Sequence, residues 1–272
     1  MSRSRAVPLQ TRSGLAILLA SVVGLIAFAW PLLADPASSV MAHSSDAPWV
    51  FAVLMPFVLA VVVAQLADGA MNAKSVAMLG VLSAVVCVLR PLGAGTVGIE
   101  PMWVVLVLGG RALGPGFGFA LGSLSMAASA LFTGGIGPWL PFQMIAAAWV
   151  GLGAGLLPGP RDGSWREVGI TASYAGAGSY AFGLLMNLWM WPFTSGLDSG
   201  IAFIPGAPIT VNLAHWLAYS IATSLAFDIP RAVLSIVLVS LLGRPVLRTL
   251  RRAARRAVFD GAAPAAVDVS RA

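Results

Sequence analysis

The chain contains a succession of apolar segments long enough to cross a lipid bilayer, separated by short stretches that carry most of its charge. Of its 272 residues, 58% are hydrophobic and only 10% are charged, whereas soluble domains carry about 25% charged residues. A membrane span needs about 20 apolar residues, and only helices and closed barrels satisfy their backbone groups in lipid. The sequence therefore predicts an all-α, polytopic membrane helical bundle.

Eight membrane spans are predicted from these segments and from the glycine- and proline-rich turns between them. For the eighth span, Asp228 and Pro230 interrupt a long apolar stretch, so we expect a loop or half-helix to Phe227 and then a helix to Leu247. The arginines from Arg248 onward predict a short basic amphipathic helix at the inner leaflet. The first seven spans are predicted at 15–34, 49–66, 73–89, 100–110, 117–132, 139–157 and 168–191.

The distribution of basic residues predicts the orientation of the chain. With a cytoplasmic N-terminus, 14 of the 16 Lys and Arg residues fall on the inner side, and the outer loops at 35–48, 133–138 and 192–211 carry none. This positive-inside pattern predicts a multi-pass protein of the cell membrane with both termini in the cytoplasm. The net charge of +6 then reflects topology and contacts with membrane lipid, not nucleic acid. A cleaved signal peptide is the alternative interpretation of the first segment.

The motifs of several enzyme classes are missing from the sequence. No glycine-rich loop ends in Lys-Ser or Lys-Thr, as a phosphate-binding loop requires. The single cysteine, Cys87, lies in an apolar segment, and the two histidines, His43 and His215, are far apart. We therefore expect no catalytic residues, no metal and no cofactor.

Polar and aromatic residues gather near the predicted outer ends of spans three to eight. A pocket with aromatic walls and a few hydrogen-bonding groups suits a flat, partly polar small molecule. Each residue type also has a structural interpretation: interfacial anchoring for tryptophan, mutual neutralisation for Asp228 and Arg231, and a helix–helix hydrogen bond for Asn187. The candidate substrate-binding residues are Arg90, Glu100, Trp103, Trp139, Gln143, Asn187, Trp189, Asn212, His215, Asp228 and Arg231.

A stripe of small residues follows one face of the third span. Its members recur at helical offsets of four, three and four, and the rest of the segment is mainly apolar. Helices in lipid associate where small side chains let two backbones approach. The stripe therefore predicts a docking face for a partner helix, with ordinary packing inside the bundle as the alternative. Its residues are Ala73, Ala77, Gly80 and Ala84.

Over about Ala73–Arg252 the chain resembles the substrate-binding S component of an energy-coupling factor (ECF) vitamin transporter of actinobacterial type. Residues 73–84 have the Ala-x-x-x-Ala type of pattern by which such proteins dock on their coupling subunit. The stretch GGIGPWLPFQ at 134–143 is similar to the start of the sixth span in such proteins. The segment DIPRA at 228–232, followed by LGRP at 242–245, also resembles theirs. The resemblance implies a six-helix substrate-binding core in residues 71–252. Two extra transmembrane helices in residues 1–70 precede it, and a basic tail follows in residues 253–272.

The resemblance also implies a function and partners. The chain would capture a vitamin or related micronutrient from outside, and a coupling membrane subunit (the T component) with two ATPase subunits would drive uptake. This agrees with the missing phosphate-binding loop. Cobalamin or another corrinoid is slightly favoured over riboflavin and other vitamins. The alternatives are a structural subunit without a ligand and a membrane-embedded enzyme acting on a lipid-linked substrate. The inner loop offers that enzyme only Asp162 and Glu167, which we expect to be solvated beside their neighbouring arginines.

Overall fold

The computed structural model describes residues 11–33, 60, 71, 73–93, 97–194 and 196–259, and all regular elements within them are helices. The predicted all-α membrane bundle is confirmed. Four segments are long and apolar enough to cross a membrane: Thr11–Leu33, Ala73–Gly93, Pro115–Thr133 and Ile209–Arg255. His43 and, apart from residue 60, the predicted span at 49–66 lie outside the described residues. The elements are α1 (Thr11–Leu33), α5 (Ala73–Leu89), η1 (Arg90–Gly93), α6 (Met102–Leu113), α7 (Pro115–Thr133), α8 (Leu140–Leu156), α9 (Trp165–Met190), η2 (Trp191–Phe193) and α10 (Ile209–Phe259).

The centre of the bundle is formed by α6, α7 and α8, whose backbones touch at glycines. A Cβ atom built on Gly118 or on Gly110 would lie 2.1 Å from the carbonyl oxygen of Gly151. Residues with side chains cannot approach so closely, and helices in lipid gain much of their association energy from such contacts. Gly110, Gly118 and Gly151 therefore allow α6, α7 and α8 to pack backbone against backbone.

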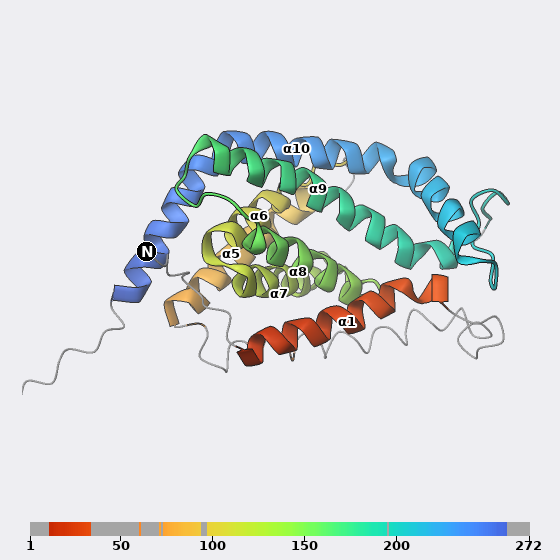
Figure 1. The fold of residues 1–272 in the computed structure, drawn as a ribbon, viewed down its shortest axis with the longest axis horizontal. Helices are drawn as coiled ribbons and strands as arrows, with labels where there is room; N and C mark the ends of the chain where they lie inside the picture. Colours follow the sequence, from red (N-terminus) through yellow and green to blue (C-terminus); the bar gives the residue numbers. More distant parts are fainter. Residues whose placement is uncertain are drawn as a thin grey trace, which may run out of the picture.

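Helices α9 and α10 lie side by side along one edge of the bundle, and α1 lies along the opposite edge (Figure 1). Helix α1 packs against α7, α8 and α9. At this contact the Trp149 indole N–H donates a hydrogen bond to the Ser21 hydroxyl over 3.0 Å, and Gly24 leaves room for the side chains of Ile145 and Trp149. In this structure the N-terminal apolar segment packs as one of the helices of the bundle.

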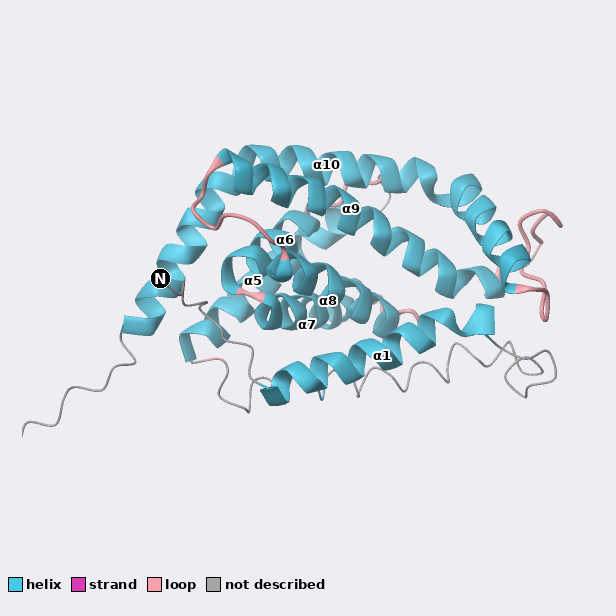
Figure 2. Cartoon of the chain, in the orientation of Figure 1, coloured by secondary structure: helices cyan, strands magenta, loops and turns pink. Residues whose placement is uncertain are grey.

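Helix α10 differs from the prediction because it is one continuous helix of 51 residues (Figure 2). The expected interruption near Asp228 was wrong, and so was the separate basic helix from Arg248, because α10 runs through both regions. Pro230 and Pro245 lie inside it. Membrane helices tolerate proline because neighbouring groups satisfy the freed backbone carbonyls, and the ribbon bends along its length (Figure 1).

The fourth predicted span, 100–110, corresponds to α6, which has 12 residues. At 1.5 Å per residue it is about 18 Å long, which is shorter than the hydrocarbon core of about 30 Å. One residue, Gly114, connects it to α7, with a φ of 107° that favours glycine. This tight connection holds α6 inside the bundle, where most of its side chains are buried.

Candidate functional site

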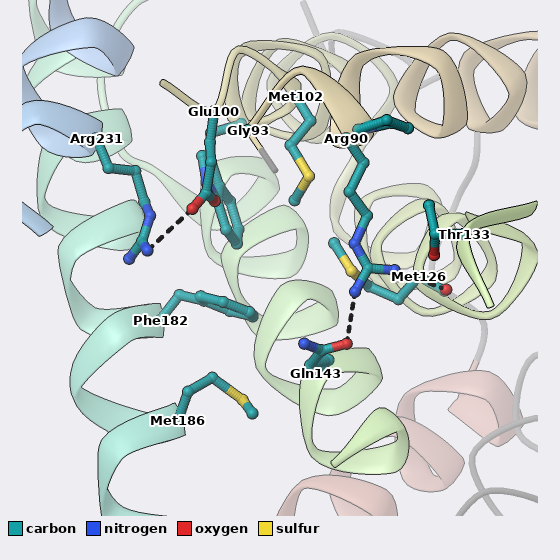
Figure 3. Close-up of a pocket in the computed structure, with 12 residues that line it drawn as sticks. Arg90, Gly93, Glu100, Met102, Met126, Thr133, Gln143, Phe182, Met186 and Arg231 are labelled. Atoms are coloured by element: carbon teal, nitrogen blue, oxygen red, sulfur yellow. Dashed lines mark hydrogen bonds and ion pairs between the residues drawn. The ribbon is translucent and has the colours of Figure 1, made fainter. Parts of the chain in front are cut away.

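A cavity of about 400 Å³ lies where η1, α6, α7, α8, α9 and α10 converge (Figure 3). Its volume is typical of small-molecule binding sites, which span about 300–1,000 Å³. Helix α5 leads into η1 at this end of the bundle, α6 and α8 begin here, and α7 ends here. The lining residues are Arg90, Pro91, Gly93, Glu100, Met102, Trp103, Met126, Thr133, Gln143, Phe182, Met186 and Arg231.

Arg90 lies on one side of the cavity among neutral partners. Its guanidinium donates hydrogen bonds to the Gln143 side-chain oxygen over 2.6 Å and to the Ser129 hydroxyl over 2.5 Å. A longer bond of 3.4 Å reaches the Met126 carbonyl. Within the described part of the chain, Arg90 forms no ion pair. Its positive charge therefore faces the cavity with no described carboxylate in contact with it, and Glu100, which lines the same cavity, acts on it only at longer range.

Arg231 lies on the opposite side and is held by two carboxylates. Its guanidinium lies 3.0 Å from a Glu100 oxygen and 2.7 Å from an Asp228 oxygen. The other Glu100 oxygen accepts a hydrogen bond from the Trp103 indole over 2.9 Å. Asp228 fits beside α9 because Gly183 has no side chain: a Cβ there would lie 2.1 Å from the carboxylate. The charge of Arg231 is thus compensated by the protein itself.

The remaining wall of the cavity is apolar. The rings of Trp103 and Phe182 lie 4.5 Å apart between their centroids, and the Arg231 guanidinium lies 6.0 Å from the Phe182 centroid. Methionine side chains, which adapt to irregular shapes, come from α6, α7 and α9. The cavity therefore places an arginine that has no ion-pair partner among the described residues beside aromatic and thioether surfaces.

Five of the eleven candidate residues line this cavity, and six do not. Asp228 lies behind Arg231. Asn187 accepts a hydrogen bond from Ser224, and Trp139 is partly exposed and bonds to the Gly135 carbonyl. The other three contact neighbouring rings or the segment before α10: Trp189 packs on Phe142 and Phe193, Asn212 bonds to the Ile204 backbone, and His215 bonds to the Ala202 carbonyl.

Sequence reasoning missed the apolar wall. Met126, Phe182 and Met186 lie within helices, where apolar residues are the rule in a membrane chain. Ser129, which accepts a hydrogen bond from Arg90, was also missed. It lies one helical turn after Met126, among other small residues of the same helix.

A second polar cluster, the inner ion cluster, consists of Arg111, Glu167 and Arg251 and joins α6, α9 and α10. Glu167 is fully buried, so the expectation of a solvated loop residue was wrong. Its carboxylate accepts hydrogen bonds from Arg111 over 3.0 Å, from Arg251 and from the Gly163 N–H over 2.8 Å. The buried Arg111 also donates to the carbonyls of the loop that begins at Leu157.

The small-residue stripe on α5 faces outward from the described bundle. Ala73, Ala77, Gly80 and Ala84 are all exposed, and a Cβ on Gly80 would meet no atom within 4 Å. The exposed face of α10 instead carries large side chains such as Leu217, Ile221 and Leu241, as is usual for lipid-facing surfaces. Among the described residues, none covers the stripe.

Together, the helices and the match to a family model define a multi-pass membrane protein, and its cavity has the size of a small-molecule site. A family model described as "ECF transporter, substrate-specific component" matches residues 74–243, which is more than half of the chain. The chain therefore belongs to the family of ECF transporter S components, as its sequence resemblance predicted. These are transport subunits that work with a T component and ATPases. Curated proteins give no match, and solved structures give none either.

Proposed function

We propose that this S component binds a small micronutrient, a vitamin or a related compound, that carries one anionic group on an apolar or aromatic body. The anionic group, a carboxylate or phosphate, would bind Arg90, with Gln143 and Ser129 completing its surroundings. The body would rest against Trp103 and Phe182.

The charge of Arg90 is the observation that carries this proposal. Removing a charge from water is costly unless it is paired and hydrogen-bonded, and the half-buried Arg90 has hydrogen bonds but no described ion-pair partner. Glu100 and Asp228 are engaged with Arg231 on the other side. A ligand anion at Arg90 would supply the missing charge, and guanidinium groups recognise carboxylates and phosphates particularly well.

The size of the cavity supports a ligand smaller than the corrinoid that the sequence favours. About 400 Å³ suits a compact molecule, whereas a corrinoid has a four-pyrrole macrocycle with a nucleotide loop and would not be enclosed. Riboflavin is smaller but carries no anionic group to match Arg90. A compact vitamin with a carboxylate agrees with both the size and the charge.

Binding of matched ligand pairs tests this proposal. The members of each pair differ only at the acidic group, which is neutral in the second: nicotinate with nicotinamide, pantothenate with pantothenol, and biotin with its amide. We expect the purified protein to bind one acid, measured by calorimetry or by tryptophan fluorescence, and to reject its neutral partner. Arg90→Gln should weaken binding by about thirtyfold or more, because loss of one partner of a buried charge pair costs at least about 2 kcal/mol. Arg166→Gln is the control, since Arg166 is exposed and does not line the cavity.

Equal binding of an acid and its amide, or unchanged affinity in Arg90→Gln, would contradict the proposal. Tight binding of cobalamin or riboflavin by the wild-type protein would contradict it as well.

The exposed stripe on α5 is proposed as the docking face for the T component, which works with two ATPase subunits. Its exposure and the open space at Gly80 support this assignment. The positive-inside pattern supports cytoplasmic termini, so that the cavity opens outward.

A further inference from the structure

The C-terminal part of α10 carries a row of arginines that the transport function does not use. Arg248, Arg252 and Arg255 recur at offsets of four and three, so they lie on one face of the helix. All three are exposed, and none forms an ion pair within the described residues. We call these three residues the arginine row.

The inner ion cluster fixes the direction in which the arginine row points. Arg251 is bound to the buried Glu167, and Leu247 and Ala254 are buried in the core beside the partly buried Leu250. This part of α10 is therefore held against the bundle by its apolar side and by one arginine. The arginine row lies on the neighbouring side of the helix, where the Arg248 side chain passes beside Gly163 of the loop before α9.

The row lies close to the level at which α10 leaves the apolar part of the membrane. The exposed apolar side chains of α10 continue to Leu241 and Leu242. Arg248 follows Leu242 by six residues, about 9 Å along a helix. The ribbon of α10 also changes direction toward this end (Figure 1), so the row does not simply continue the path of the span.

We propose that the arginine row binds the headgroups of anionic phospholipids in the inner leaflet. The charges are complementary, and basic residues immediately beside a membrane span are attracted to an anionic surface. The apolar face of the segment is occupied by the protein core, so binding occurs through the phosphates and not through insertion into the acyl chains. The bound phospholipid would hold the inner end of α10 at the membrane surface.

The test compares retention of two lipids by the full-length protein in detergent. Phosphatidylglycerol and phosphatidylcholine are added in equal amounts, and native mass spectrometry counts the lipids that remain bound. Each arginine removed should lower the affinity for phosphatidylglycerol about fivefold, which corresponds to about 1 kcal/mol per residue. The triple variant Arg248→Gln, Arg252→Gln, Arg255→Gln should therefore lose the preference for phosphatidylglycerol.

Two further variants separate the arginine row from general charge and from misfolding. The triple variant Arg12→Gln, Lys74→Gln, Arg166→Gln removes the same number of exposed charges elsewhere and should keep the preference. Replacement of the row by three lysines should keep most of it, which also shows that the segment folds. The proposal would be overturned if the wild type and the variant Arg248→Gln, Arg252→Gln, Arg255→Gln retained phosphatidylglycerol equally. It would also be overturned if this variant and the variant Arg12→Gln, Lys74→Gln, Arg166→Gln lost the same amount of bound phosphatidylglycerol. Unchanged lipid binding with loss of co-purification of the T component would overturn it too, since the row would then be a protein contact.

Discussion

Replacement of Glu167 by glutamine should destabilise the protein more than any other single polar change in the inner ion cluster. The variant keeps the size of the side chain and one oxygen acceptor, but it removes the charge that Arg111 and Arg251 share. Arg111 is fully buried, and its remaining described partners are backbone carbonyls. It would become an uncompensated buried cation.

Breaking a buried ion pair by removing one partner costs about 3–5 kcal/mol. Arg111 and Glu167 are both 0% exposed, so we place Glu167→Gln in this range. Arg251→Gln should cost less, because the Arg251 side chain is 14% exposed and Arg111 keeps its carboxylate partner. The loss for Glu167→Gln would be a large fraction of the 5–15 kcal/mol that stabilises a typical protein.

Unfolding of the detergent-solubilised protein, followed by tryptophan fluorescence, measures this loss. Asp198→Asn is the matched control, since Asp198 is exposed and its described contacts are local, and surface changes are usually within about 0.5 kcal/mol. A loss below about 1 kcal/mol for Glu167→Gln, or a larger loss for Arg251→Gln, would refute the reasoning about burial and charge.

Three further predictions concern helix packing and partner docking. Gly118→Ala should disrupt the α7–α8 contact and lower thermal stability, because the added Cβ would lie 2.1 Å from a backbone oxygen. Gly169→Ala is the contrast: its added Cβ would meet no atom within 4 Å, so the free energy of unfolding should rise by up to about 1 kcal/mol. Ala77→Trp should abolish uptake into vesicles that contain the T component and ATPases while ligand binding is unchanged. Leu241→Trp on α10 is the control and should support normal uptake. Normal uptake by Ala77→Trp would show that the stripe is not the docking face. Trp149→Phe should lower stability by about 1 kcal/mol through loss of the hydrogen bond between α1 and α8, and an unchanged unfolding curve would argue against that contact.

The sequence predicts the helices well where hydropathy and turns agree. The bounds predicted for the third span are those of α5, and the spans at 117–132, 139–157 and 168–191 correspond to α7, α8 and α9 within a few residues. The prediction of a helix break at Pro230 was wrong. In soluble proteins an internal proline usually ends a helix because a backbone hydrogen bond is lost, but in a membrane bundle neighbouring groups can bind the carbonyl that proline leaves free.

The site is only partly readable from the sequence, for two physical reasons. Polar residues such as Arg90 and Gln143 stand out because charge and amide groups are rare in membrane spans. Met126 and Met186 do not stand out, since apolar residues occur on every face of these helices. Glu167 was misinterpreted because its partners Arg111 and Arg251 are 56 and 84 residues away in the chain, and local spacing carries no information about them.

The continuity of α10 has a mechanical consequence. Its 51 residues correspond to a contour of about 77 Å, more than twice the hydrocarbon thickness of about 30 Å. Arg231, beside the cavity, and Arg251, in the inner ion cluster, therefore lie 20 residues apart on one continuous helix, although Pro245 between them allows it to bend. Reorientation of the bundle would move both residues together, so probes attached near each should report the same movement at the same time.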